Sequence, residues 1–553
     1  MKSKRILALM STLLVGATAF SGCGGKQTGT SEKDPTKANL TVATYDGGVG
    51  KAWLEDAARR FEKLHENSTH FQEGRTGVAI DLDADKVNYG GTNLKEKTLT
   101  RDVYFTEGVE YYAYVDRDKV ADLTDVVKAS MSDYGETGTI EDKMDGAFKN
   151  YLTARDGKYY MLPFYDGFYG FIYDIDLFEE AGFYFDQYGD FIGLDKGASD
   201  TERAEFEEAK SNGPDGKAGT YDDGLPATYA QMIELADEIA SKGYVPFCYS
   251  GQVTDYVDKA IRSFISDYEG YDAMLLNYTL NGKATVVDTI ANGVVTKTKE
   301  VTITPSNAYE LQKQAGKYYA LSMEEQLFGT AKYVGGTYNA MEFTEAQRTF
   351  IYSKYAATRY AMLIEGVWWE NEADVTFAEI ETQRGEKKSD RRFGFLPMPK
   401  QNESLVGTNQ TMLSLNSSYG FINKNAKNME LAKEFMRFLH SDSEMSKFSA
   451  KTSIPRSLNY SVAVEDRDNA TSFGKTLIDM RSNAKVVYPY SSQQLILDNS
   501  SAFTESKWFS TALVNGNEYS LLFDTFSQGK ATAEQYFNGM YTYHENAWKK
   551  LNK

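Results

Sequence analysis

A repeated order of strand, turn and amphipathic helix is the feature that most constrains this fold. The chain first gives a candidate strand over 40–44, a Gly47-Gly48 turn and a helix over 51–66 with its apolar residues on one stripe. The same order returns in the helix that begins after Thr228 and the strand predicted over 244–248. Helices of this kind bury their stripe against a sheet, so we expect an α/β fold.

Further segments repeat this order or interrupt it. Short strands are predicted over 101–105, 169–173 and 419–422, and a helix is predicted to open at Asp176 with that carboxylate as its cap. Two polar stretches, 195–224 and 278–304, indicate insertions. The second alternates β-branched and polar residues around Asn281-Gly282 and Asn292-Gly293, which predicts hairpins at both places.

Length and charge limit what the chain can be. Its 553 residues predict more than one lobe, because single hydrophobic cores stop growing near about 250–300 residues. The formal net charge is −19, and an acidic surface repels phosphate backbones, so we expect no nucleic-acid partner. Aromatic residues make up 14% of the chain and Tyr outnumbers Phe, which fits rings whose hydroxyls reach water or a ligand.

The N-terminus has the features of a targeting segment. Positive residues precede an apolar run over 6–20 that is short for a membrane span, and Phe20-Ser21-Gly22-Cys23 is similar to a bacterial lipobox. We therefore predict a lipoprotein signal peptide over 1–22 and a palmitate-bearing lipid anchor on Cys23, followed by a flexible tether that ends at residue 38. Cys248 lies in an apolar run and is expected to be a buried thiol.

Motifs for catalysis are missing from the sequence. The four histidines do not form a zinc motif, and there is no nucleophile elbow, phosphate-binding loop or dinucleotide fingerprint. The chain is therefore expected not to be an enzyme and to need no cofactor. A cell-surface glycoside hydrolase stays open as an alternative, because its two carboxylates need only meet in space.

One acidic loop suits a cation. Asp215, Asp222 and Asp223 lie in a Gly-rich run whose oxygen ligands and flexibility suit calcium, although their spacing is not that of an EF-hand. We predict a structural calcium site there; the alternative is a solvated loop that uses Asp and Gly for turns.

Several segments, in order along the chain, resemble the extracellular solute-binding proteins of ABC sugar importers, the family that includes maltose-binding protein. The segments are Glu107–Val127, Leu162-Pro163-Phe164 with Gly170–Tyr173 and Asp176–Gly182, Pro226–Gly251, Tyr360–Trp368, Phe393–Pro399, and Lys424–Leu439 with Ile454-Pro455. The resemblance implies a two-lobed, periplasmic-binding-protein-like α/β fold (type II), with a hinge and a central ligand cleft. The chain should cross between the lobes near Pro163, after Pro399 and near Pro455.

These crossings divide the chain. Residues 39–165 with 403–455 would form the N-terminal lobe, and residues 166–402 with 456–553 the C-terminal lobe, which carries both insertions. The resemblance also implies where ligand contacts lie. They are expected at the turn after the first strand, after the strand over 101–105 and in the first crossover between the lobes. Further contacts are expected in the segment Tyr360–Trp368, where Trp368 takes the position that stacks on the ligand, and at an aromatic residue near the C-terminus. The candidates are Tyr45, Asp46, Glu107, Tyr165, Asp166, Phe168, Glu365, Trp368, Trp369 and Trp508, with Ser250 and Tyr256 as weaker ones.

The implied function is capture of a carbohydrate, most simply an oligosaccharide, by hinge closure and its delivery to the permease subunits of an ABC importer. The expected protein is a monomer on the extracellular face of the bacterial cytoplasmic membrane, held there by its lipid anchor alone. A peptide or amino-acid receptor is the alternative within the binding class, and it would favour charged anchors for the peptide termini.

Overall fold

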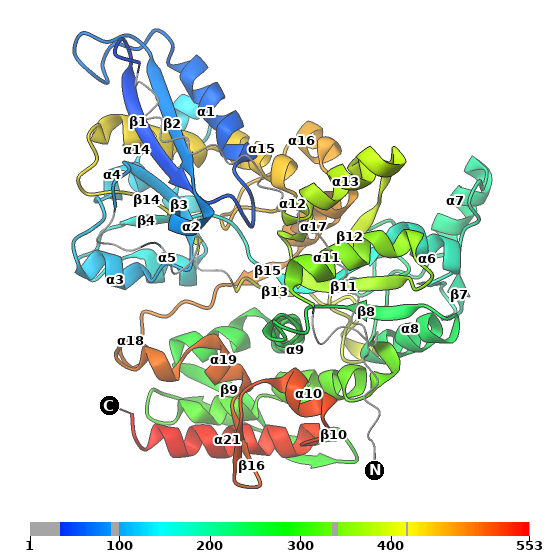
Figure 1. The fold of residues 1–553 in the computed structure, drawn as a ribbon. Helices are drawn as coiled ribbons and strands as arrows, with labels where there is room; N and C mark the ends of the chain where they lie inside the picture. The colour runs from blue at the N-terminus through cyan, green and yellow to red at the C-terminus, as the bar shows by residue number, and fades with distance from the viewer. Residues whose placement is uncertain (1–33, 90–93, 95–98, 335–340, 416–417, 552–553) are drawn as a thin grey trace, which may run out of the picture.

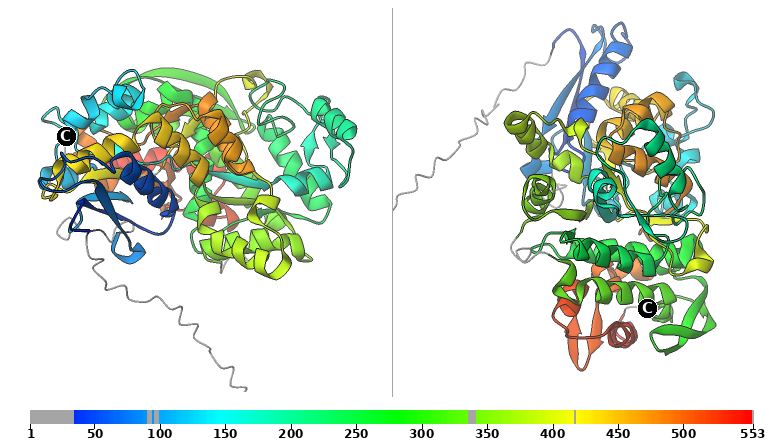
Figure 2. Two further views of the ribbon diagram at one scale, coloured as in Figure 1. Left: turned by 90° about the horizontal axis from the view of Figure 1, so that it is seen from above. Right: turned by 90° about the vertical axis from the view of Figure 1, so that its right-hand side faces the viewer.

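The protein is described by a computed structural model covering residues 34–89, 94, 99–334, 341–415 and 418–551 (Figure 1). Two α/β lobes lie side by side, as Figure 1 and the left-hand view of Figure 2 show, and a mostly helical layer lies below them, as Figure 1 and the right-hand view of Figure 2 show. The two-lobed α/β fold predicted from the sequence is confirmed. The predicted signal peptide and Cys23 lie outside the described residues.

The first lobe is built on a five-stranded mixed sheet. Strands β1, β2 and β3 run parallel, and β14 enters antiparallel to both β3 and β4. Helix α1 packs near β2, and α14 packs on β1 and β14. The sheet order is β2 (Val78–Ala84), β1 (Ala38–Thr44), β3 (Val103–Glu107), β14 (Ser418–Ile422), β4 (Met161–Pro163). Its helices are α1 (Ala52–Leu64), α2 (Lys86–Tyr89), α3 (Tyr111–Asp116), α4 (Thr124–Lys128), α5 (Gly146–Leu152), α14 (Met429–Leu439) and α15 (Asp442–Thr452).

The second lobe is built on a four-stranded sheet that is buried along most of its length. Its order is β12 (Phe393–Phe395), β5 (Tyr169–Asp174), β11 (Tyr360–Gly366), β8 (Val245–Cys248). Helices around it are α6 (Ile175–Ala181), α8 (Tyr229–Ser241), α11 (Phe343–Tyr352), α12 (Trp369–Glu372), α13 (Asp374–Arg384), α16 (Val464–Asn469) and α17 (Ser472–Asn483). All seven residues of β11 are buried, which explains why its sequence reads as a continuous apolar run broken only by Glu365.

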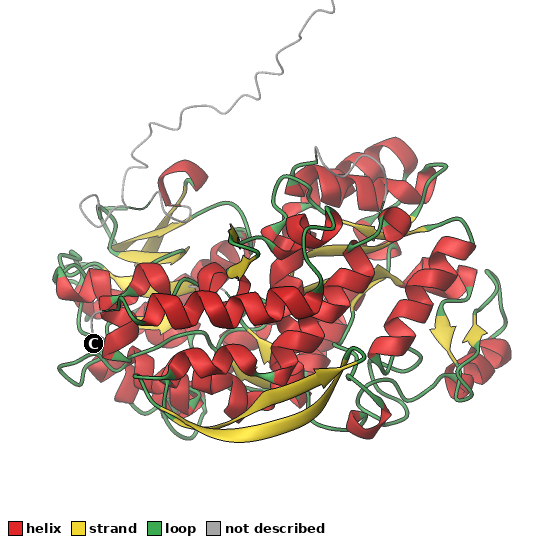
Figure 3. Cartoon of the chain, turned by 90° about the horizontal axis from the view of Figure 1, so that it is seen from below, coloured by secondary structure: helices red, strands yellow, loops and turns green. Residues whose placement is uncertain are grey.

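The helical layer is formed by two parts of the chain, one from its middle and one from its C-terminal end. Helices α10 and α21 pack together, and α10 also packs on α9, which bends at Gly270, where φ is +74°. A long hairpin curves along one side of the layer (Figure 3). The layer contains α9 (Asp255–Thr279), β9 (Gly282–Ala291), β10 (Val294–Ile303), α10 (Ala315–Phe328), α18 (Gln494–Asp498), α19 (Glu505–Ser510), β16 (Ala512–Val514), β17 (Asn517–Tyr519), α20 (Leu522–Ser527) and α21 (Ala533–Trp548). The sequence does not reveal this layer as a separate body.

Three segments that connect the lobes are hydrogen-bonded to one another. The Asp166 N–H donates to the Pro455 carbonyl at 2.9 Å, and the Leu415 N–H donates to the Gly167 carbonyl at 2.7 Å. Two short parallel strands, β13 (Thr411–Leu413) and β15 (Lys485–Val487), lie beside these segments and pack on α9. The connections therefore form one hinge between the two sheets.

Local predictions were wrong at two points. The cap of α6 is Asp174, whose carboxylate accepts the Leu177 N–H at 3.1 Å, so the helix begins one residue before Asp176. Asn281-Gly282 is not a hairpin turn, because α9 runs to Thr279 and Leu280 takes a left-handed conformation that leads directly into β9. The turn at Asn292-Gly293 joins β9 to β10 as predicted, with both residues at positive φ.

The insertion over 195–224 contains α7 (Asp200–Ala209), opened by a capping box between Ser199 and Glu202, beside the short pair β6 (Tyr184–Phe185) and β7 (Phe191–Ile192). Cys248 is buried, as expected. In the part of the chain that the structure describes, no helix has the length and apolarity to cross a membrane.

Candidate functional site

Three side chains of the first lobe gather at one edge of its sheet. Tyr45 follows β1, Glu107 ends β3 and Tyr165 follows β4. The pairing of β14 with β3 and β4 makes β4 run in the same direction as β1 and β3, so all three strands end at the same edge. In α/β sheets this carboxyl edge is where ligands bind.

These three residues are fixed in place. The Tyr165 hydroxyl donates to the Glu107 Oε2 at 2.6 Å. The Tyr45 hydroxyl is buried and has no hydrogen-bond partner among the described residues. It lies against Gly48, where a Cβ would stand 2.5 Å from that hydroxyl and where φ is +56°, so only glycine fits the turn.

The second lobe presents carboxylates toward the same place. Glu365 is the penultimate residue of β11, is 1% exposed and accepts the Gly366 N–H at 2.8 Å. The Gln347 amide lies between two carboxylates and donates to Glu372 Oε2 at 3.1 Å and to Glu365 Oε2 at 3.5 Å. Burial, and then the negative charge of Glu372, raise the pKa of Glu365 well above its usual range.

Aromatic rings of the second lobe stand beside these carboxylates. The Trp368 and Tyr169 rings meet edge to face at a centroid distance of 5.1 Å, and Tyr256 contacts Tyr169 at 5.3 Å. The Lys259 ammonium lies 4.9 Å from the Tyr169 ring centroid. Gly366 makes room for the indole, because a Cβ there would stand 2.4 Å from the Trp368 ring.

Carboxylates from both lobes raise the pKa of one tyrosine, Tyr256. Burial raises the pKa of Tyr256, and the charges of Glu365, Glu372 and Glu107 raise it further. Since Glu107 belongs to the first lobe and the other two to the second, the lobes bring their polar ends together here. We call this set the interlobe cluster: Tyr45, Glu107, Tyr165, Tyr169, Tyr256, Lys259, Gln347, Glu365, Trp368 and Glu372.

Helix α12 bonds across the lobes directly beside this cluster. The Gly48 N–H donates to the Glu372 Oε1 at 3.2 Å. The Asn371 amide donates to the Thr452 carbonyl at 2.8 Å. The Ser453 hydroxyl donates to the Glu370 Oε2 at 2.9 Å. Three consecutive residues of α12 therefore contact the first lobe.

The chemistry of the interlobe cluster is that of binding. Aromatic faces can stack on apolar C–H surfaces, and carboxylate and amide oxygens can accept hydrogen bonds from hydroxyl groups. No serine, cysteine or histidine belongs to the cluster. Within the described ranges, no group of three or more His, Cys, Asp or Glu residues could hold a metal ion.

Several predicted ligand residues lie elsewhere. Asp46 is exposed and lies 3.5 Å from Lys51 Nζ. Asp166 is fully buried in the hinge and accepts the Arg481 Nε–H at 2.9 Å, so it holds the crossing segments together. Phe168 is 2% exposed and lines a small cavity under the hinge with Phe395 and Met412.

Two predicted tryptophans are core residues in this structure. Trp369 begins α12 and is fully buried among Phe350, Phe393 and Phe473. Trp508 is 3% exposed in the helical layer, where its Nε1 donates to the Asn277 Oδ1 at 3.0 Å. Aromatic residues serve ligand contact and core packing equally well, and sequence position alone did not separate the two roles.

The acidic loop uses its carboxylates locally. Asp222 accepts the Asp215 N–H at 2.9 Å and the Thr220 hydroxyl at 2.6 Å. Asp223 accepts the Gly219 N–H at 2.7 Å. The loop's own donors thus occupy oxygens that a cation would need, and the calcium site stays a prediction.

Sequence reasoning missed four members of the interlobe cluster: Tyr169, Lys259, Gln347 and Glu372. Gln347 lies within the regular helix α11, and Lys259 lies one turn after Tyr256 in α9. Nothing local distinguishes such positions from other helical residues. Only Glu372 has a sequence signal that could indicate a ligand contact, because it lies four residues after Trp368, which is itself a predicted ligand contact.

Comparisons with known proteins agree with the two-lobed fold. The sequence model of the bacterial extracellular solute-binding proteins matches residues 48–445. The apo form of RafE from Streptococcus pneumoniae is 13% identical with a TM-score of 0.52, over 92% of this chain and 97% of that chain. The GacH receptor of Streptomyces glaucescens, solved unliganded and with acarbose, is 13% identical with a TM-score of 0.52, over 93% and 100%. No curated protein matches the sequence.

Proposed function

Because the chain belongs to the family of bacterial extracellular solute-binding proteins, we propose that it captures an oligosaccharide between its lobes and delivers it to the permease of an ABC importer. The observation that carries this proposal is the interlobe cluster, in which aromatic rings and carboxylates from two separate sheets face one place. The family is one of binding proteins and not of enzymes, in agreement with the sequence expectation.

The residue types of the cluster suit a sugar. A pyranose offers apolar C–H faces to rings such as Trp368 and Tyr169, and its rim of hydroxyls can donate to Glu107 and Glu365. The similarity in fold to GacH, which was solved with acarbose, supports a carbohydrate ligand.

Hinge closure would couple capture to helix α12. The same helix follows Trp368 and bonds to the first lobe through Glu370, Asn371 and Glu372. A sugar seated on Trp368 would therefore favour the arrangement in which these bonds form, since a ligand stabilises the state that it binds better. The closed arrangement is the form that a permease would receive.

A peptide receptor is the alternative that the cluster supports less well. Peptide termini carry a carboxylate that needs a cationic partner. Lys259 is the one cation of the interlobe cluster, and its Nζ lies 2.7 Å from the Asp255 carboxylate. The side chains of Glu107, Glu365 and Glu372 in the cluster would disfavour the terminal carboxylate of a bound peptide.

Titration calorimetry against a glycan panel and a peptide panel tests the proposal. We expect heat with at least one oligosaccharide and none with peptides. Heat with peptides alone would overturn it. Incubation with the bound glycan, followed by assay of reducing ends, tests the glycoside hydrolase alternative, and we expect no products above background.

We further propose that Cys23 carries the lipid anchor, which would place the protein on the outer face of the cytoplasmic membrane. One acyl chain binds a membrane only marginally, so stable attachment needs more than one chain. Cys23→Ala should leave the signal peptide uncleaved at this site and abolish incorporation of labelled palmitate. Unchanged labelling of the variant would contradict the assignment.

Calcium at the acidic loop is a separate proposal, and it requires the Asp215, Asp222 and Asp223 carboxylates to rearrange from the positions they have in this structure. An ion that binds only the folded state raises its stability by mass action. We expect a higher melting temperature in millimolar calcium than in excess chelator, and Asp222→Asn should remove the difference. Equal melting temperatures would show that the carboxylates serve only the turns of the loop.

A further inference from the structure

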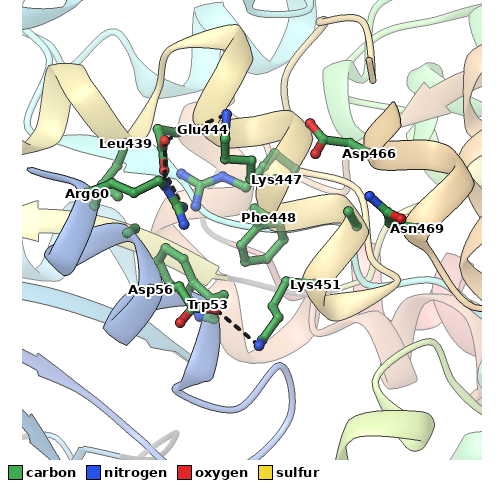
Figure 4. Close-up of a pocket in the computed structure, with 13 residues that line it drawn as sticks. Trp53, Asp56, Arg60, Leu439, Glu444, Lys447, Phe448, Lys451, Asp466 and Asn469 are labelled. Carbon is green, nitrogen blue, oxygen red and sulfur yellow. Dashed lines mark hydrogen bonds and ion pairs between the residues drawn. The ribbon is translucent and has the colours of Figure 1, made fainter. Parts of the chain in front are cut away.

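A second pocket lies mainly on the first lobe, at its border with α16 of the second lobe, and shares no lining residue with the interlobe cluster. It has a volume of about 270 Å³ and opens between α1, α15 and α16 (Figure 4). Trp53 and Phe448 contribute aromatic surface, and Lys451 reaches Asp56 across the pocket at 3.0 Å. The charged lining residues are four cations and three carboxylates, which leaves one net positive charge: Arg60, Lys447, Lys451, Arg456, Asp56, Glu444 and Asp466.

Arg456 in the wall of this pocket has no anionic partner among the described residues. It is 1% exposed, and its Nε and Nη1 make no hydrogen bond there. Its Nη2 lies 2.9 Å from the His440 Nε2. Burial lowers the pKa of His440 to about 3, so at neutral pH the ring is uncharged and provides no counter-charge for Arg456.

The carboxylates of the pocket are already engaged. Arg60 donates to both oxygens of Glu444, at 2.6 and 2.9 Å. Asp56 pairs with Lys451, and Asp466 accepts the Ser446 hydroxyl at 2.5 Å. None of them is an ion-pair partner of Arg456, so its positive charge is buried without a counter-charge.

Rings around Arg456 lessen this cost but do not replace an acceptor. The guanidinium carbon lies 5.1 Å from the Phe448 ring centroid and 5.7 Å from that of Trp53. Cation–π contacts stabilise a buried cation, yet they satisfy no N–H group. The Trp53 Nε1–H is also buried without a partner among the described residues. Three donor nitrogens on two side chains of one wall therefore lack an acceptor.

We propose that this pocket binds a small carboxylate, with its negative charge at Arg456. A singly charged anion matches the single net positive charge, and a carboxylate oxygen accepts hydrogen bonds from guanidinium and indole N–H groups. The volume lies below the usual range of drug-sized ligand pockets, about 300–1,000 Å³, so the ligand is small. Because the unpaired nitrogens are covered by the wall, a neighbouring side chain must turn aside when the ligand enters.

The test uses the intact protein without sugar. Calorimetry and thermal unfolding are measured with acetate, lactate and benzoate, and with chloride and phosphate at equal ionic strength. We expect saturable binding of at least one monocarboxylate and a rise in melting temperature, with neither for chloride or phosphate. Absence of saturable binding, or phosphate binding as tightly as the carboxylates, would overturn the proposal.

Two variants localise the binding. Arg456→Met keeps the side-chain length and removes the charge, and should weaken carboxylate binding by at least about tenfold. Because a buried charge without a partner is destabilising, its removal should leave this variant melting no lower than the wild type without ligand. Ala450→Phe fills the pocket from α15, leaves Arg456 unchanged and should block binding equally.

The matched control is Lys427→Met, which removes an exposed positive charge of the same lobe outside the pocket. It should bind carboxylate as the wild type does. Loss of binding in the control, or binding retained in both pocket variants, would mean that the anion is held elsewhere.

Discussion

Two regions of this molecule use the same types of side chain for opposite purposes. In the interlobe cluster, Trp368 and its tyrosines stand beside carboxylates that come from two sheets joined by a hinge. In the helical layer, Trp508 stands beside Asn277 and Lys317, all of which are buried. There the Lys317 Nζ donates to the Asn277 Oδ1 at 3.0 Å and to the Gln312 Oε1 at 3.1 Å.

The difference lies in where the polar groups find their partners. Asn277 accepts hydrogen bonds from both Trp508 and Lys317, so these three side chains find partners in one another within the helical layer. In the interlobe cluster the Tyr45 hydroxyl has no partner among the described residues, and Glu365 and Glu372 share one amide. Incomplete pairing at a boundary between two bodies is typical of a ligand site, whereas complete pairing within one body is typical of a core.

The largest expected effect is on stability in the helical layer. Trp508→Ala should lower the free energy of unfolding by roughly 3–5 kcal/mol, because it opens a cavity and leaves Asn277 and Lys317 short of a neighbour. Chemical denaturation measures this loss, and sugar affinity of the folded fraction should stay within about twofold. A sugar affinity lost together with stability would place Trp508 in the ligand site after all.

The next effect is on affinity in the interlobe cluster. Trp368→Ala should weaken sugar binding by well over tenfold, about 2 kcal/mol or more, because the indole is the largest apolar face there. Trp368 is only 7% exposed, so some loss of stability is also expected, smaller than that of Trp508→Ala. Calorimetry of the Trp368→Ala and Trp508→Ala variants measures which of the two loses more sugar affinity. Equal sugar affinities of the two variants would contradict the distinction between ligand site and core.

Acid should weaken the helical layer through His544. This residue is 3% exposed, and burial and then the Lys317 charge lower its pKa to about 3, below its unfolded value of about 6.5. The unfolded state therefore binds the proton first, and stability is lost as pH falls from 6.5 toward 3. Between pH 6.5 and 5 we expect His544→Gln to remove roughly 2 kcal/mol of this loss. Parallel stability–pH curves for wild type and variant would contradict the assignment.

The smallest effect concerns helix α12. Asn371→Ala removes its hydrogen bond to Thr452 and should weaken sugar binding by about 1 kcal/mol, or about fivefold, with little change in melting temperature. Asn425→Ala, an exposed position of the first lobe, is the control. A variant with unchanged affinity would show that α12 does not contribute to capture.

How far the sequence predicted the site depends on where each residue lies. Tyr45, Glu107 and Glu365 lie at or next to the ends of strands, and because strand ends can be located from apolar runs and turns, the sequence predicts these three residues. Gln347 and Lys259 approach the site from helices whose rotation relative to the sheet depends on tertiary packing. The strand–turn–helix order likewise gave both α/β lobes but not the helical layer, because its helices α10 and α21 are far apart in sequence and their contact has no local pattern.

A crystal structure with the oligosaccharide that gives calorimetric heat tests the central claim most directly. We predict a pyranose ring stacked on Trp368, with its hydroxyls donating to Glu107 of the first lobe and to Glu365 or Glu372 of the second. The bonds from α12 to Gly48 and Thr452 should be present in that complex. A sugar bound in the helical layer beside Trp508, or on one lobe alone, would contradict capture between the lobes.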